Sequence, residues 1–242
     1  MRNLLHLYKL EIKLAIREFS VVLFGIVIPM GIMLLLGYIY KGKNVEMINS
    51  SFSSVVSIGI CATGLMGIPI VLASYRERKI LKQFQVTPIS PMKLLLAQVM
   101  CAFTFAISSS TGVFLVAKGV FSYSMKGNVM YFFISYLILS FSIYSIGLLI
   151  GSVSKSVKTV NVLTTLFYFP MFFLSGATIP YEILPKSIQI FSNIMPLTQG
   201  IKLLKTVSMG TTESIKVPVM VLLTIGLMCS YFSIRFFKYE IK

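Results

Sequence analysis

Long apolar stretches without any charged residue alternate with short charged segments along most of the chain. Reading from one charged residue to the next gives six uncharged intervals of 18 to 29 residues. A helix that crosses a bilayer needs roughly 20 apolar residues, whereas a barrel strand shows about 10 residues of alternating polarity, which these intervals lack. The pattern therefore predicts an all-α integral membrane protein with six transmembrane helices. The intervals are residues 19–40, 47–75, 94–117, 127–154, 159–181 and 217–234.

The segment before the first interval, residues 4–19, separates apolar and basic residues at helical spacing. Such a helix is suited to lie in the inner membrane interface. The sequence therefore predicts an N-terminal amphipathic interfacial helix, although a basic flank that only orients the first span would share this composition. The apolar positions are Leu5, Tyr8, Ile12, Ala15, Ile16 and Phe19, and the basic positions are Lys9, Lys13 and Arg17.

The connection between the fifth and sixth intervals, residues 175–216, fits neither a span nor a free loop. It is too polar and too interrupted by proline to cross a membrane, yet it carries many isoleucines, leucines and phenylalanines. Irregular backbone at membrane depth must be packed against protein. We therefore expect two short re-entrant helices that dip into the outer leaflet. The residues that mark this segment are Ser175, Gly176, Pro180, Pro185 and Pro196.

Composition and charge agree with a membrane protein. Of the 242 residues, 56% are hydrophobic and 12% charged, and the net charge is +15. With the N-terminus inside, 14 of the 22 basic residues fall in inner segments and 8 in outer ones. The positive-inside rule then predicts both termini in the cytoplasm, and the basic residues are expected to meet anionic lipid and no nucleic acid. Because no internal repeat divides the chain, residues 1–242 are expected to form a single transmembrane domain.

The residues needed for most catalytic chemistry are missing from the sequence. There is one histidine, no aspartate and no phosphate-binding G-x-x-x-x-G-K-[ST] loop, and the three cysteines lie in separate apolar intervals. We therefore expect no metal site and no catalytic residue. All seven glutamates lie away from the centres of the spans, whereas ion-coupled carriers need ionisable groups at membrane depth. Any uphill transport must then draw its energy from another protein.

One charged stretch, "YRERKILKQFQVTPIS" at residues 75–90, separates the second uncharged interval from the third. Residues 76–85 make about three helical turns, with an apolar edge and charges elsewhere, and Thr87-Pro88 ends the helix because the residue before proline avoids the α region. Such a helix could dock in a groove of a soluble protein, although an ordinary positively charged loop is the alternative. Its notable residues are Arg76, Glu77, Arg78, Lys79, Lys82 and Phe84.

Two segments resemble the ABC-2 type transporter permeases. Residues 75–99 are similar to that family's E-R-E start, short helix and T-P-[IV]-S break between spans two and three. Two departures are that Arg76-Glu77-Arg78, followed by Lys79, lacks the second acidic residue, and that the glycine common after it is absent, with Ile80-Leu81 following directly. Residues 172–205, which include Ser175-Gly176 and Leu184-Pro185, resemble its "SG...P...LP..........P" pattern. Together with the six spans, the resemblance covers essentially the whole chain.

The resemblance implies a half-transporter. Two permease subunits, of the same or a related chain, would enclose a pathway above two copies of a separate ATP-binding protein, which would bind the ATP and magnesium. The family's coupling helix corresponds to residues 76–85, in which Glu77 is the residue expected to contact the ATPase. The N-terminal helix with Arg17 and Glu18 would face the same partner. The chain itself would be a multi-pass protein of the bacterial cytoplasmic membrane and no enzyme.

The resemblance also places the pathway along the second and fifth spans. The residues there form an apolar wall with few polar points, which suits amphipathic cargo. Export of a drug, toxin or amphipathic peptide is therefore expected. Alternatives are a lipid-linked glycan exporter and a non-transporting immunity or sensor protein, and each wall residue could instead serve helix packing alone. The wall residues are Ser57, Thr63, Met66, Asn161, Thr164, Phe167, Tyr168 and Met171.

Overall fold

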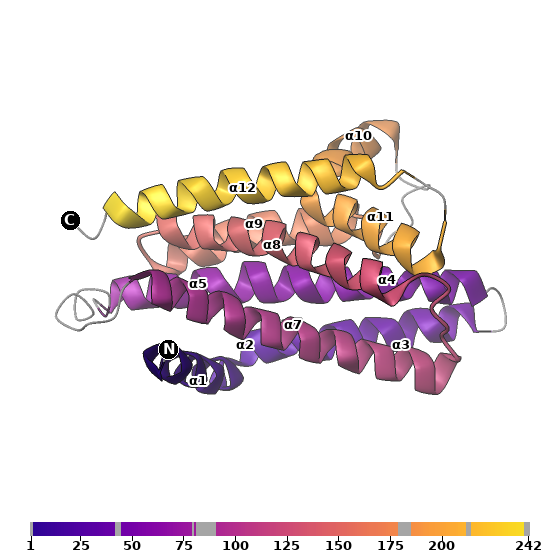
Figure 1. The fold of residues 1–242 in the computed structure, drawn as a ribbon, viewed down its shortest axis with the longest axis horizontal. Helices are drawn as coiled ribbons and strands as arrows, with labels where there is room; N and C mark the ends of the chain where they lie inside the picture. Colours follow the sequence, from indigo (N-terminus) through magenta and orange to yellow (C-terminus); the bar gives the residue numbers. More distant parts are fainter. Residues whose placement is uncertain are drawn as a thin grey trace.

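The computed structural model describes residues 2–41, 45–78, 80, 91–178, 185–211 and 214–239, and within these ranges it contains helices and no strand. Most of the helices run side by side along the long axis of the molecule (Figure 1). Their bounds are α1 Arg2–Arg17, α2 Phe19–Val22, η1 Leu23–Val27, α3 Ile28–Tyr40, α4 Val45–Ala62, η2 Thr63–Gly67, α5 Ile68–Glu77, α7 Pro91–Phe121, α8 Val129–Val153, α9 Val157–Leu174, α10 Lys186–Ile194, α11 Pro196–Met209 and α12 Lys216–Tyr239.

Six helical segments of the described chain are long and apolar enough to cross a membrane, which confirms the predicted six spans. We call the end of the bundle that holds α1, the end of α5 and the α8–α9 turn the basal end, and the opposite end, with α10, the distal end (Figure 1). The spans are Leu23–Tyr40, Glu46–Glu77, Met92–Phe121, Val129–Val153, Val157–Leu174 and Lys216–Phe236.

The second span, α4–η2–α5, lies at the centre of the bundle, and 83% of an 18-residue apolar stretch within it is buried. It contacts α3, α7, α8, α9 and α11. Lipid tails are as apolar as leucine, so helices in a bilayer associate through close packing and hydrogen bonds. The serine and glycine residues of this span allow that close approach. The hydroxyl of Ser57, for example, donates to the carbonyl of Ser53 within the same helix, at 2.8 Å.

A close helix contact joins α8 to the second span through glycines. Gly147 and Gly151 are four residues apart and face η2 and α5. A Cβ atom added to Gly147 would lie 2.3 Å from the carbonyl oxygen of Gly64, so no larger residue fits without a shift of backbone. This small-xxx-small spacing fixes the separation between the second and fourth spans.

Two five-residue π-helical turns, η1 and η2, interrupt the first and second spans. Each is followed by a proline at the start of the next helix, Pro29 after η1 and Pro69 after η2. Proline has no N–H to donate, and its ring clashes with the carbonyl four residues earlier, so the preceding turn widens. The two wide turns contact each other, with Gly25 of η1 against Thr63 of η2.

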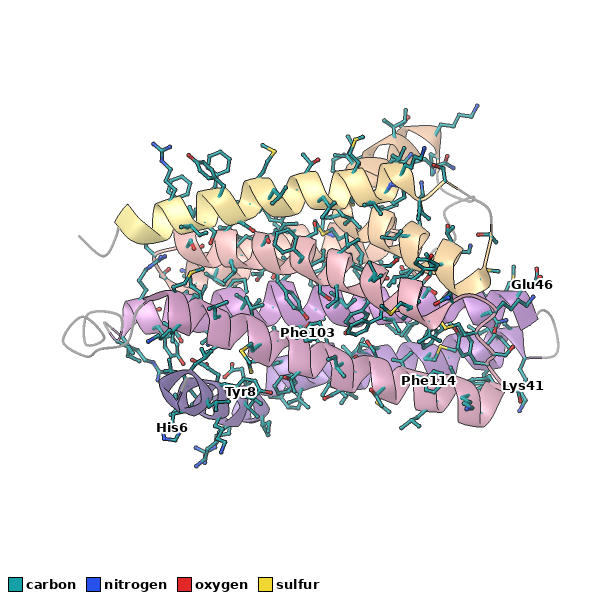
Figure 2. All side chains as sticks on the ribbon, viewed as in Figure 1. His6, Tyr8, Lys41, Glu46, Phe103 and Phe114 are labelled. Atoms are coloured by element: carbon teal, nitrogen blue, oxygen red, sulfur yellow. The ribbon has the colours of Figure 1, made fainter. Side chains whose placement is uncertain are left out.

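The predicted N-terminal helix is present as α1 and lies across the bundle direction, nearly end-on in Figure 1. Its face toward the bundle differs in part from the expected one. Leu7, Glu11 and Ala15, spaced four residues apart, are buried, while Leu5 and Ile16 are exposed. His6 lies on the side of α1 away from the bundle (Figure 2). In a membrane interface apolar residues also cover the lipid-facing flanks of a helix. Periodicity alone therefore does not separate the face that packs on the bundle from the face that meets lipid.

The distal end contains the two short helices expected between the fifth and sixth spans. α11 is largely buried between α4, α8 and α12, and the hydroxyls of Ser53 and Ser208 join it to α4 at 2.6 Å. Ser175 ends α9, and Pro196 begins α11. Gly176 has a positive φ of 83°, and Pro185 caps the start of α10. Pro180 lies outside the described residues, and the dip of these helices into the outer leaflet stays a prediction.

Candidate functional site

The end of α5 is hydrogen-bonded to the turn between α8 and α9. The Arg76 guanidinium donates from Nη1 to the carbonyl of Gly151, at 2.9 Å, and to that of Ser154. These are among the last carbonyls of α8, whose C-terminus carries a partial negative charge. Arg76 therefore binds a site that the helix end makes favourable for a cation.

The next residue, Glu77, binds the helix on the other side of the same turn. Its Oε2 accepts a hydrogen bond from the backbone N–H of Val157, the first residue of α9, at 3.0 Å. A helix N-terminus has unsatisfied N–H groups and a partial positive charge, so a carboxylate is stabilised there. The basic residue Arg76 thus binds the C-terminus of α8, and the acidic residue Glu77 binds the N-terminus of α9.

The other residues expected to couple to an ATPase lie near this contact or outside the described part. Arg78 follows α5 as an exposed C-cap, and Arg17 and Glu18 are exposed at the end of α1. Lys79, Lys82 and Phe84, and with them most of the predicted coupling helix 76–85, lie outside the described residues. The structure therefore places only the start of this segment, at the basal end beside α1.

α1 is held on the bundle by two polar contacts. The hydroxyl of Tyr75 donates to the Glu11 carboxylate at 2.6 Å, and the hydroxyls of Tyr8 and Thr104 lie 2.7 Å apart. Burial raises the pKa of Glu11 above its ordinary value of 4.5, while the hydrogen bond from Tyr75 acts in the opposite direction. Because Tyr75 immediately precedes Arg76, the same turn of α5 binds both α1 and the α8–α9 turn.

A second cluster lies where η1, η2 and α9 meet. The ring of Tyr168 from α9 packs edge-on against Phe24 of η1, with centroids 6.4 Å apart, and stacks on Phe172 at 5.8 Å. Only 2% of Tyr168 is exposed. Within the described part of the chain its hydroxyl has no hydrogen-bond partner, which is unusual because buried polar groups are generally paired.

The eight residues expected to form a wall along the second and fifth spans do not share one surface of this structure. Ser57 and Thr63 are buried in the centre of the bundle, where their hydroxyls donate to carbonyls of their own helix. Three α9 residues turn inward with them and two face outward. The inward residues are Thr164, Tyr168 and Met171, the outward ones are Asn161 and Phe167, and Met66 of η2 is half-buried.

An apolar groove of about 380 Å³ lies elsewhere, between α7, α8 and α12. Its lining includes Phe103, which Figure 2 labels, together with Phe141, Tyr144 and Ile234. None of the eight expected wall residues borders it. The groove and the predicted pathway are therefore separate features of the protein.

Several contact residues were not singled out by the sequence. Glu11 lies within the predicted interfacial helix, and its spacing of four from Leu7 and from Ala15 is the signal that could identify their shared buried face. Gly147 and Gly151 form a G-x-x-x-G pattern, which is a signal for close helix packing. The position of Gln98, buried on α7 beside Glu11, had no sequence signal.

Comparison with known proteins identifies relatives of the chain. The family model for the ABC-2 type transporter matches residues 2–208. The chain is 26% identical over 133 residues to the inner membrane transport permease YhhJ of Escherichia coli strain K12, a match that covers 54% of this chain and 36% of that protein. It is 25% identical over 193 residues to nodulation protein J of Rhizobium meliloti strain 1021, covering 77% and 71% of the two chains. The chain thus spans about a third of the length of the first of these relatives.

Proposed function

The chain belongs to the ABC-2 type transporter family, and from this premise we propose that it is the transmembrane permease subunit of a bacterial ATP-binding cassette exporter. The observation that carries the proposal is the family match over residues 2–208 of a chain with six transmembrane helices. Its relative in Escherichia coli is named an inner membrane transport permease, which supports a place in the bacterial cytoplasmic membrane. A separate ATP-binding protein supplies hydrolysis and binds the ATP and magnesium.

The basal end faces the cytoplasm in this proposal. The excess of basic residues in the segments that meet at this end supports the orientation, since positive charge is retained inside. The side of α1 opposite its buried face carries Lys9, Lys13 and Arg17, all exposed, which suits anionic headgroups or an acidic protein surface. Both termini then lie in the cytoplasm, where the ATPase binds.

The connection from Arg78 to α7 is the docking element for the ATPase. It follows α5 at the basal end, and its sequence combines the charged Lys79 and Lys82 with the apolar Phe84, a composition suited to an amphipathic docking segment. Arg17 and Glu18, exposed at the end of α1, belong to the same proposed ATPase contact. ATP binding closes the ATPase dimer, displaces this surface and shifts the permease toward outward release.

The cargo is a drug, toxin or amphipathic peptide that passes beside the cluster of η1, η2 and α9. The cluster is apolar and aromatic, with Met66, Tyr168 and Met171 among its residues and the Tyr168 hydroxyl as an unpaired polar group. A second permease subunit, of the same or a related chain, covers α9, whose outer face exposes Val162, Leu166 and Phe173. The pathway then forms between the two subunits.

The proposal is tested by co-expressing the chain with the ATP-binding protein encoded beside it. Wild type should retain the ATPase in equal numbers through purification, and inside-out vesicles should take up rhodamine 6G, an amphipathic cation, or a cationic amphipathic peptide when given ATP. The double charge reversal Lys79→Glu/Lys82→Glu should lose the ATPase.

The matched control is Lys118→Glu, a charge reversal near the distal end of α7, which should change neither result. A wild-type chain that retains no ATPase would contradict the role of permease subunit. Retention of the ATPase without ATP-dependent uptake of either probe would leave that role standing and contradict the cargo class.

A further inference from the structure

Two hydrogen bonds bind the N-terminus of α9, one from a residue near it in the sequence and one from a residue far from it. The Ser156 hydroxyl caps it locally by accepting from the N–H of Thr159, at 3.2 Å. Glu77 caps it from α5, 80 residues away in the chain, by accepting from the N–H of Val157. The local bond stabilises the helix start whatever its surroundings, whereas the long-range bond ties the position of α9 to the end of α5.

α9 is the helix whose position such a bond can control. Only 22% of its residues are buried within the described chain, against 83% of an 18-residue apolar stretch of the second span, so few packing contacts fix its place. Yet α9 carries Tyr168 into the cluster with η1 and η2. A displacement at its first residue would therefore be carried along a continuous helix to the middle of the bundle.

Glu77 also occupies the last helical position before the proposed docking connection, since α5 ends there and Arg78 is its C-cap. Its neighbour Arg76 holds the end of α8. Any movement of the connection must therefore reach the α8–α9 turn through these two side chains or break their bonds. In the structure, the Glu77 carboxylate is directed to the protein's own helix.

From this geometry we infer that Glu77 is a positioning residue, which transmits the displacement of the docking connection to α9 through the N–H of Val157. The inference rests on the proposed function and changes one part of it. The sequence pattern predicts that Glu77 contacts the ATPase, whereas here its partner is α9. The ATPase then meets the residues that follow Glu77, and Glu77 passes their movement on.

The bond can be removed from either end. Glu77→Ala removes the acceptor. Val157→Pro removes the donor, and proline is favoured at the first helical position, where its missing N–H costs no helix bond. Ser156 already has the extended backbone, φ −140° and ψ 155°, that a residue before proline requires. Ser156→Ala is the matched control, because it weakens the local cap and leaves the Glu77 bond in place.

The readout needs no knowledge of the cargo. Spin labels are placed at Lys158 in the first turn of α9 and Leu227 on α12, both exposed, after the three cysteines have been replaced by alanine. In the complex with the ATPase, ATP with vanadate should shift the distance between the labels. The shift should be lost in Glu77→Ala, in Val157→Pro and in the double variant, and kept in Ser156→Ala, while all four retain the ATPase.

The bond also has a local signature. Hydrogen exchange at the first turn of α9 should become faster in Glu77→Ala even without ATPase, by on the order of tenfold for a lost charge-assisted bond. If Val157→Pro kept the distance shift and Glu77→Ala lost the ATPase, the inference would be overturned. Glu77 would then be a residue that contacts the ATPase. A wild-type complex that binds ATPase but shows no shift of α9 would overturn it too. Failure of wild type to bind any ATPase would instead contradict the proposed function on which the inference rests.

Discussion

The second and fifth spans are both apolar helices, yet they have opposite places in the protein. Within the second span, Glu46–Glu77, 83% of an 18-residue apolar stretch is buried, whereas only 22% of the 18 residues of the fifth span, Val157–Leu174, are buried. Mean hydropathy does not explain the difference, because the first span, Leu23–Tyr40, has nearly the hydropathy of the second, 2.1 against 2.2, and is as exposed as the fifth. In a membrane, apolar character places a helix in the bilayer without deciding which neighbours it packs against.

Side-chain size explains the difference better. The second span contains Ser53, Ser57, Gly59 and Gly64, small residues that let five other helices come close. The fifth span instead presents large side chains such as Leu166 and Phe167 on its outer face. Packing and hydrogen bonds drive helix association in lipid, so small residues mark the centre of the bundle. The fifth span has a smaller buried share than the second, and it is the span whose movement we propose.

The largest effect is expected at the glycine contact that locks the second span against α8. Gly147→Leu would place a side chain against the Gly64 carbonyl, where even a Cβ atom would come within 2.3 Å. Because backbone must move, we expect the free energy of unfolding to fall by about 3 kcal/mol or more. Reversible unfolding in bicelles would measure it.

The control for this substitution is Gly119→Leu on α7, where nothing lies within 4 Å of an added Cβ. It should be neutral or slightly stabilising, since glycine is a poor helix former. Equal losses in the two variants would show that the glycine contact does not hold the second span in place.

Side-chain truncations in the second and fifth spans should change the free energy of unfolding by different but smaller amounts. Ile58→Ala in the fully buried part of α4 leaves a cavity and should cost about 2 kcal/mol, mostly from lost packing because lipid and protein interior are similarly apolar. Leu166→Ala on α9, 64% exposed, should change the unfolding free energy of the single chain by less than about 0.5 kcal/mol. A cost at Leu166 that appears only at high protein concentration would sharpen the comparison, because it would show that a second subunit covers α9.

The sequence predicted the number and approximate ends of the spans because a span is recognised from the apolar character of consecutive residues. It predicted α1 from the helical spacing of apolar and basic residues, which is also a local pattern. It did not predict which face of α1 is buried, since exposed Leu5 and Ile16 are as apolar as buried Leu7 and Ala15. Nor could it separate packing from lining on the second span, where the serine and threonine expected to face a pathway, Ser57 and Thr63, are bonded within their own helix. Both distinctions depend on long-range packing, which a single sequence does not show.

A pH-dependent effect is expected where α1 binds the second span. Tyr75, Gln98 and Cys101 face Glu11, and burial raises its pKa above 4.5. A raised pKa means that the folded state favours the protonated acid, so this contribution is complete at pH below the ordinary value and is lost as pH rises through the raised one. Hydrogen exchange in α1 should therefore speed up, beyond its intrinsic increase, as the pH rises above 4.5 and through the raised pKa of Glu11. Glu11→Gln should abolish this excess, and a wild type without it would show that the carboxyl is ionised at little cost.

The smallest effect on stability is expected at Tyr168, where the two spans meet. Removing an unpaired buried hydroxyl relieves a desolvation cost, so Tyr168→Phe should leave the unfolding free energy unchanged or raise it by up to about 1 kcal/mol. The ring contacts with Phe24 and Phe172 remain. If the hydroxyl serves passing cargo, ATP-dependent uptake of rhodamine 6G should nevertheless change. A loss of stability instead would mean that a partner already satisfies the hydroxyl. The fifth span would then be fixed in the bundle by that bond, and its mobility relative to the second span would lose its main support.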